Sequence, residues 1–158
     1  MSETATGTLS QKSVLKDMLA QCAGWQAMVD AADATAAAAF VFVEGFRVTN
    51  LARPFAEISG GSNVTDELTG HVSGVLQMSI EAEVPEEYQD DVEFADPMIW
   101  FENQISIVRD ELIDLSRGTG GWLIIRTIEM DFPKRGDEDQ RESEGDFLVA
   151  ELTINFGI

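Results

Sequence analysis

The sequence predicts an α+β fold, in which a mostly antiparallel or mixed β-sheet is packed on one face by an N-terminal helix and a central amphipathic helix. Two segments place apolar residues every three or four positions, which is typical of helices. Other segments are β-branched or alternate apolar with polar residues, which indicates strands. The 158 residues contain no internal repeat or linker, so we expect a single domain over 1–158, with 1–9 as a flexible N-terminus.

The helix predicted near the N-terminus has one apolar face, at spacings of four, four and three residues. This face consists of Val14, Met18, Cys22 and Trp25. Ser10 is its candidate N-cap, and Gly24 lies near its end. An alanine-rich stretch, 30–40, predicts a second short helix.

The central helix carries the clearest helical signal in the chain. Asp96 is the expected N-cap, Pro97 occupies the first helical position and Gly118 follows the last turn. Its core-facing stripe consists of Met98, Phe101, Ile105, Val108, Leu112 and Leu115.

The strands are predicted from alternation and from β-branched content. Residues 39–46 read as a buried strand, and 53–61 as a shorter one that Pro54 places at a sheet edge or strand start. The following "SGGSN" is interpreted as a turn. The most regular strand is 74–84, and the last two, 122–130 and 147–158, form an antiparallel hairpin with an edge strand at the end of the chain.

The net charge of −19, from 29 acidic and 10 basic residues, repels phosphates and anionic lipids. We therefore expect no sequence-specific nucleic-acid binding and no membrane role. No run reaches membrane-spanning length, and "MSETATGTLS" lacks the features of a signal peptide. A single cysteine, Cys22, excludes an internal disulfide and is expected to pack as a small apolar residue.

No motif predicts catalysis, so we expect no enzyme, no cofactor and no metal. His71 is the only histidine and is interpreted as a surface residue, and Cys22 has no histidine to activate it. "SGGSN" and "GTGG" lack the Lys-Ser/Thr of a phosphate-binding loop. Residues 81–96 hold eight acidic side chains, but their spacing is not that of an EF-hand, and a solvated acidic face is favoured over a calcium or magnesium site.

The last two strands are separated by a long charged hairpin loop, 131–146, with seven acidic and three basic residues. Such a loop suits a solvated arm that docks on a charged neighbour or lines a wet channel. We expect its cations to meet the purely acidic 81–96 stretch of a neighbouring subunit. The predicted contact residues are Asp90, Asp91, Glu93, Lys134, Arg135, Asp137, Glu138, Asp139 and Arg141.

The layout of the chain from about Leu9 onward resembles that of the tail terminators, or tail-completion proteins, of long-tailed bacteriophages. The resemblance rests on "RPFAEISGG", "GHVSGVLQMSIEAEVP", "FENQISIVRDELIDLSR", "GGWLIIRTIEMDFPKR" and "GDFLVAELTINFGI" in this order after an N-terminal helix. It implies a virion protein that forms a ring, typically of six subunits, which caps the tail tube and joins it to the head–neck connector while DNA passes through the lumen. The high acid content departs from the family pattern and leaves open which neighbours the surface faces.

Three other functions fit parts of the sequence. A head–tail adaptor or stopper would also form an acidic ring, and the virion component that it contacts would separate it from a terminator. An acidic DNA-mimic inhibitor fits the size and charge, although its carboxylates should follow one continuous face. A small enzyme would use Asp90, Asp91 and Glu93 with a divalent cation.

Overall fold

The computed structural model describes residues 8–43, 53–85, 95–118, 123–132 and 147–157. Four helices and five strands lie within these ranges. In chain order they are α1 (Thr8–Gln21), α2 (Ala23–Met28), α3 (Ala34–Ala38), β1 (Val41–Val43), β2 (Phe55–Thr65), β3 (Val72–Glu83), α4 (Ala95–Arg117), β4 (Ile124–Asp131) and β5 (Phe147–Gly157).

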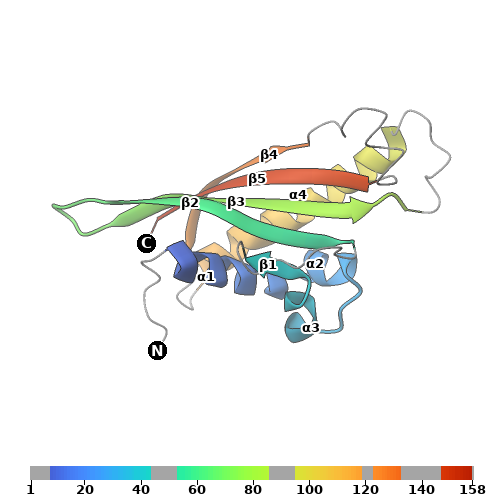
Figure 1. Ribbon diagram of the computed structural model, residues 1–158, viewed down its shortest axis with the longest axis horizontal. Coiled ribbons are helices and arrows are strands. Elements are labelled where there is room, and N and C mark those ends of the chain that lie inside the picture. Colours follow the sequence, from blue (N-terminus) through green and yellow to red (C-terminus); the bar gives the residue numbers. More distant parts are fainter. Residues whose placement is uncertain (1–7, 44–52, 86–94, 119–122, 133–146, 158) are drawn as a thin grey trace.

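The strands form one mixed sheet in the order β1-β2-β3-β5-β4. β1 is parallel to β2, and every other neighbouring pair is antiparallel. The helices cover one face of this sheet, with α1 against β1 and β2 and α4 against β4 and β5 (Figure 1). The predicted α+β fold is therefore confirmed.

The expectation that the final strand forms a sheet edge is wrong. β5 pairs with β3 along one side and with β4 along the other, so β1 and β4 are the outer strands of the described sheet. The apolar residues that alternate along β5, from Leu148 to Phe156, are buried in the core, on the face of the sheet that the helices cover. A strand that fills the core in this way gains most in the centre of the sheet.

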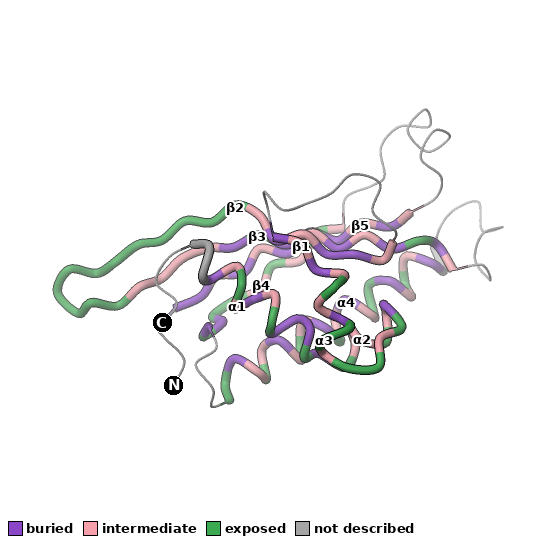
Figure 2. Tube along the Cα trace, turned by 60° about the horizontal axis from the view of Figure 1, so that its bottom comes forward, coloured by how far each residue is buried: buried purple, intermediate pink, exposed green. Residues whose placement is uncertain are grey.

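The core forms where the apolar faces of the helices meet the inner face of the sheet (Figure 2). The predicted stripes of the two helices supply one side of it, and Phe101, Ile105, Val108 and Leu112 of α4 are fully buried. The alternating residues of β3 supply the other side, from Leu76 to Ala82. Trp25 joins two helices, because its indole N–H donates to the Ala37 carbonyl at 3.3 Å.

The helix ends differ from the prediction by a residue or more. α1 begins at Thr8, so Ser10 lies inside the helix, and the expected single helix is broken after Gln21, where the backbone of Cys22 is extended. α4 begins at Ala95, one residue before the expected N-cap. Its end is as predicted, since the Gly118 N–H donates to the Leu115 carbonyl at 3.1 Å.

A side chain distant in sequence stabilises the start of α2. The Glu111 carboxylate accepts hydrogen bonds from the backbone N–H groups of Ala23 and Gly24, each at 2.7 Å. These are two of the donors that the first turn of a helix leaves without an intrahelical partner. Glu111 thereby ties α2 to α4 and allows the chain to turn sharply at Cys22.

Candidate assembly surfaces

The nine predicted contact residues lie outside the described residues, so their contacts remain predictions. They fall in two connectors, 86–94 and 133–146. The described ends of these connectors nevertheless lie together, because Glu83 ends β3 opposite Phe147 at the start of β5, and Asp131 ends β4 opposite Glu151. Both acidic connectors therefore leave the sheet at the same end.

Cys22 and His71 are two residues that the sequence singled out for possible chemistry, and the structure describes both. Burial, and then the nearby charge of Glu111, raise the pKa of Cys22 to about 12, so the thiol is neutral at physiological pH. Its sulfur lies 3.4 Å from the Met18 carbonyl, to which the S–H donates. Within the described ranges, no group of three or more His, Cys, Asp or Glu side chains is placed to hold a metal ion. His71 is exposed, as predicted.

The face of the sheet that the helices leave uncovered is acidic. Its carboxylates belong to alternate residues of four strands, whose intervening residues point into the core. We call this surface the acidic sheet face; it consists of Glu57, Glu81, Glu83, Glu129, Asp131 and Glu151. One cation paired with this face is Arg53, which lies 3.1 Å from Glu81 and 4.1 Å from the centre of the Phe147 ring.

The strand register places one pair of like charges on this face directly opposite each other. Asp131 is directly opposite Glu151, which is opposite Ser79, and Ser79 is opposite Glu57. Like charges directly opposite each other across two strands are destabilising. The Asp131–Glu151 pair is therefore expected to cost the subunit some stability.

The hairpin of β2 and β3 extends far beyond the body as an exposed two-stranded ribbon (Figures 1 and 2). We call residues 60–74 the arm. The prediction of a turn at "SGGSN" is wrong, because β2 continues through it to Thr65. The register shifts between Ser59 and Ser62, where Gly60 and Gly61 have positive φ angles of 67° and 118°. This bulge lies at the base of the ribbon, and β3 still pairs with β5 beyond it as far as Ser73, opposite Gly157.

The tip of the arm is an ordered turn. The Asp66 carboxylate accepts from the Leu68 N–H at 2.8 Å, and the Asp66 carbonyl accepts from the Gly70 N–H at 2.7 Å. The Asp66 N–H donates to the His71 carbonyl at 2.8 Å. These bonds hold Leu68 at the apex with 97% of its surface exposed.

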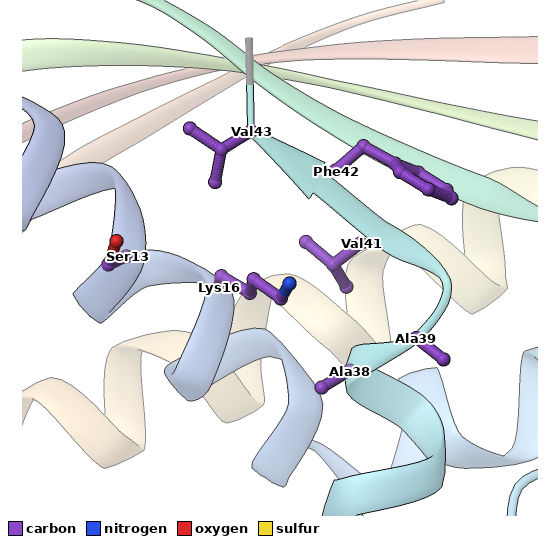
Figure 3. Close-up of a pocket in the computed structure, with 7 residues that line it drawn as sticks. All are labelled: Ser13, Lys16, Ala38, Ala39, Val41, Phe42 and Val43. Carbon is purple, nitrogen blue, oxygen red and sulfur yellow. The ribbon is translucent and has the colours of Figure 1, made fainter. Parts of the chain in front are cut away.

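A groove lies beside the outer strand β1, between that strand and α1 (Figure 3). We call it the β1 groove; it has a volume of about 290 Å³ and is lined by Ser13, Lys16, Ala38, Ala39, Val41, Phe42 and Val43. Lys16 extends from α1 into the space in front of the strand (Figure 3). No strand pairs with this side of β1 in the described sheet. An unpaired strand edge presents backbone donors and acceptors to a partner.

A second hollow, of about 370 Å³, lies at the end of the body away from the arm, between α2, α4 and the ends of β2 and β3. Its lining includes Met28, Trp100, Gln104, Arg53 and Glu83. The guanidinium of Arg53 is already engaged by Glu81 and Phe147. This hollow therefore has no uncommitted cation among its described lining residues.

Sequence reasoning missed the arm, the groove and the acidic sheet face as surfaces. The arm has no period-two apolar pattern, and its glycines resemble a turn. The groove depends on which strand lies at the sheet edge, which a single sequence does not reveal. The acidic sheet face was visible in part, because the glutamates of 74–84 recur at every second position.

No protein-family model matches the chain, and no curated protein matches its sequence. Among solved structures, the chain is similar to a chain of the virion of native gene transfer agent (GTA) particle. The two are 15% identical, superpose with a TM-score of 0.54, and match over 99% of this chain and 98% of the other. At this identity the likeness shows a shared fold along the whole length. Within the described residues, no helix is long and apolar enough to cross a membrane.

Proposed function

We propose that the protein is a non-enzymatic structural component of a phage-like virion, and that it acts as a tail terminator. In this role it forms a ring at the head-proximal end of the tail tube and joins the tube to the head–neck connector. The observation that carries the proposal is the full-length likeness in fold to a chain of a gene transfer agent virion. The order of sequence segments that resembles tail terminators supports the same role.

The subunit has surfaces that suit a closed ring. A ring needs two different patches on each subunit, because every interface joins the front of one copy to the back of the next. The arm projects from one end of the sheet, and both acidic connectors begin at the other. The six-subunit ring, the tail tube and the connector as partners, and location in the virion are parts of this proposal.

The first test is the mass of the purified protein in solution, measured by light scattering over a range of concentrations and salt. Negative-stain images of the same samples would show the particles. Rings of about six subunits that bind the ends of purified tail tubes are the expected result. Rings that bind only the head connector would instead identify an adaptor or stopper. A monomer that does not bind tail tubes would overturn the proposal.

We further propose that the acidic sheet face borders the path of DNA through the ring. Phosphate contacts dominate the affinity of proteins for DNA, so carboxylates along the path prevent DNA from adhering. The strand residues that lead into the two acidic connectors, Glu81, Glu83 and Asp131, lie on this face. The Asp131–Glu151 pair of like charges is consistent with a surface whose charge serves the passage of DNA.

Neutralising this face tests its role. A variant with Glu83→Gln, Glu129→Gln and Glu151→Gln should retain DNA in a low-salt filter-binding assay more strongly than the parent rings. The matched control changes three exposed acids of α4, Glu102→Gln, Asp110→Asn and Asp114→Asn, and alters the net charge equally. Equal DNA retention by both variants would show that only net charge matters and would remove the lumen assignment.

The same face leaves a DNA-mimic inhibitor as the second candidate, because carboxylates on one continuous surface are what such a protein needs. A mimic would act as a monomer or dimer and would bind a basic DNA-processing enzyme. The two functions predict opposite results in the light-scattering experiment, and the neutralised variant would lose enzyme binding only if the protein is a mimic.

A further inference from the structure

We propose that the arm of one copy of this chain seats in the β1 groove of a second copy, with Leu68 in the groove and Glu67 paired with Lys16. This contact would be the head-to-tail interface of the ring, so the inference rests on the proposed function and adds the residues that join the subunits. The occupant of the groove is thus a second copy of this chain.

The arm has the properties of a segment that gains its burial from a partner. All described residues from Gly60 to His71 are exposed, so this ribbon contributes little apolar burial to its own subunit. A two-stranded ribbon in water is at best marginally stable. Two of its large apolar side chains, Val64 and Leu68, are 66% and 97% exposed. The ordered turn holds Leu68 in place before binding, which reduces the entropy lost when a partner covers it.

The β1 groove has the size and lining to receive this tip. Five of its seven lining residues are apolar, and their alanine and valine side chains leave a volume of about 290 Å³. This is at the small end of the range of about 300–1,000 Å³ that is typical of ligand pockets, and it suits one inserted side chain. The edge of β1 that has no partner strand within the described sheet lies alongside, where it could pair with backbone groups of the arriving turn.

Charge selects this groove over the second hollow. The described arm contains Asp66 and Glu67 and no lysine or arginine, so its tip is anionic. Asp66 is used within the turn, whereas Glu67 makes no hydrogen bond or ion pair within the described residues. Lys16 of the β1 groove likewise has no ion pair within them. The second hollow presents Glu83 and an Arg53 that is already paired, so it would not attract the tip.

The two surfaces are different patches of one subunit, which is the requirement for a closed ring. The tip lies beyond the end of the body (Figure 1), and the groove lies on the body between α1 and β1 (Figure 3). An arm that reaches a different patch on the next copy makes a heterologous contact. Such contacts repeat around the ring until the first subunit meets the last.

Charge reversal tests the proposed pair. We expect Glu67→Lys and Lys16→Glu each to weaken self-association by about tenfold or more, because each places like charges together at the contact. The chain carrying both changes should associate nearly as well as the parent, since the pair is restored with opposite sign. Asp110→Lys, an exposed change on α4, is the matched control and should leave association unchanged. Failure of the double variant to recover would overturn the pairing.

Cysteine coupling tests the location of the contact. A Leu68→Cys chain mixed with a Ser13→Cys chain should give a covalent heterodimer with a short bis-maleimide linker. Cys22 should remain unreacted, because it is buried and its thiol is neutral. The matched control replaces Ser13→Cys by Gln104→Cys in the second hollow. Preferential coupling to Gln104→Cys, or coupling of Leu68→Cys only to itself or to tail tube protein, would overturn the inference.

The outcomes also separate this inference from the proposed function. If the parent chain forms rings and binds tail tubes while the Glu67 and Leu68 variants do the same, the ring is real and the arm contact is wrong. If the parent chain stays monomeric with tail tubes present, the proposed function fails and the arm contact fails with it.

Discussion

The two halves of the β2–β3 hairpin differ in burial: the half in the body packs on the core, and the half in the arm is exposed. In the body, β3 alternates buried Leu76, Met78 and Ile80 with more exposed residues, and β2 and β5 flank it. In the arm, β2 and β3 pair with each other and the residues from Gly60 to His71 are exposed. The body half is therefore stabilised by the core of the subunit, whereas the arm half is stabilised by the hydrogen bonds of its turn. The exposed tip of the arm therefore presents side chains such as Leu68 to a neighbouring molecule.

The largest expected loss of stability comes from a substitution in the core of the body. Phe101→Ala should lower the free energy of unfolding by about 3–5 kcal/mol, because the ring is fully buried and packs edge-on against Phe132 at 5.9 Å. Denaturant unfolding monitored by circular dichroism measures it. Glu102→Ala, at the exposed neighbouring position, is the control and should change stability by less than about 0.5 kcal/mol. Equal effects at the two positions would mean that α4 does not pack as described.

The next effect lies at the border between the two halves. A Cβ atom at Gly74 would overlap the Ser62 carbonyl and lie 2.8 Å from the Phe156 ring. We expect Gly74→Ala to cost about 1–3 kcal/mol, since overfilling a packed site forces its neighbours to move. Ser73→Ala, one residue further into the arm, should cost clearly less. Hydrogen exchange of β3 amides would show whether the loss extends into the body; a stable Gly74→Ala variant with an unchanged sheet would contradict the close contact.

The body of the fold was predictable because burying one face of a helix or strand requires apolar residues at regular intervals in the sequence. The stripes of α1 and α4 and the alternation of β3 and β5 follow from the need to cover one face of each element. The strand order was not predictable, since β3 and β5 read alike whether they lie at the centre or the edge. Helix breaks were missed for a related reason, because the capping of α2 by Glu111 joins residues far apart in the chain.

The candidate surfaces were less predictable, because they are defined by what the subunit leaves uncovered. Charge drew attention to Arg135 and Arg141, which lie outside the described residues, whereas the described arm carries a lone exposed leucine and two glycines in its bulge. In sequence, "SGGSN" and "DELTGH" have the composition of ordinary loops. Only the register of β2 against β3 shows that they form one projecting ribbon.

A smaller effect tests the junction of the first two helices. Glu111→Gln should lower stability by about 1–2 kcal/mol, because a charged acceptor of two backbone N–H groups becomes neutral. The same change should lower the pKa of Cys22, although the pKa should stay raised because burial is its main cause. Denaturant unfolding and the pH dependence of thiol labelling measure the two effects. The control Asp110→Asn removes a neighbouring charge from an exposed pair with Arg109, and it should change the stability and the pKa of Cys22 little. A loss of stability in this control as large as that of Glu111→Gln would refute the capping role.

The smallest expected effect on stability belongs to the tip of the arm. Leu68→Ser should change the free energy of unfolding by less than about 0.5 kcal/mol, because the side chain contacts little of its own subunit. The same variant should lose self-association in light scattering, since the apolar group that enters the partner is gone. A marked loss of stability would show that the arm packs on its own body and would erase the distinction between the two halves. Unchanged stability with lost association would show instead that this leucine, although the most exposed large apolar side chain among the described residues, is retained for a neighbour.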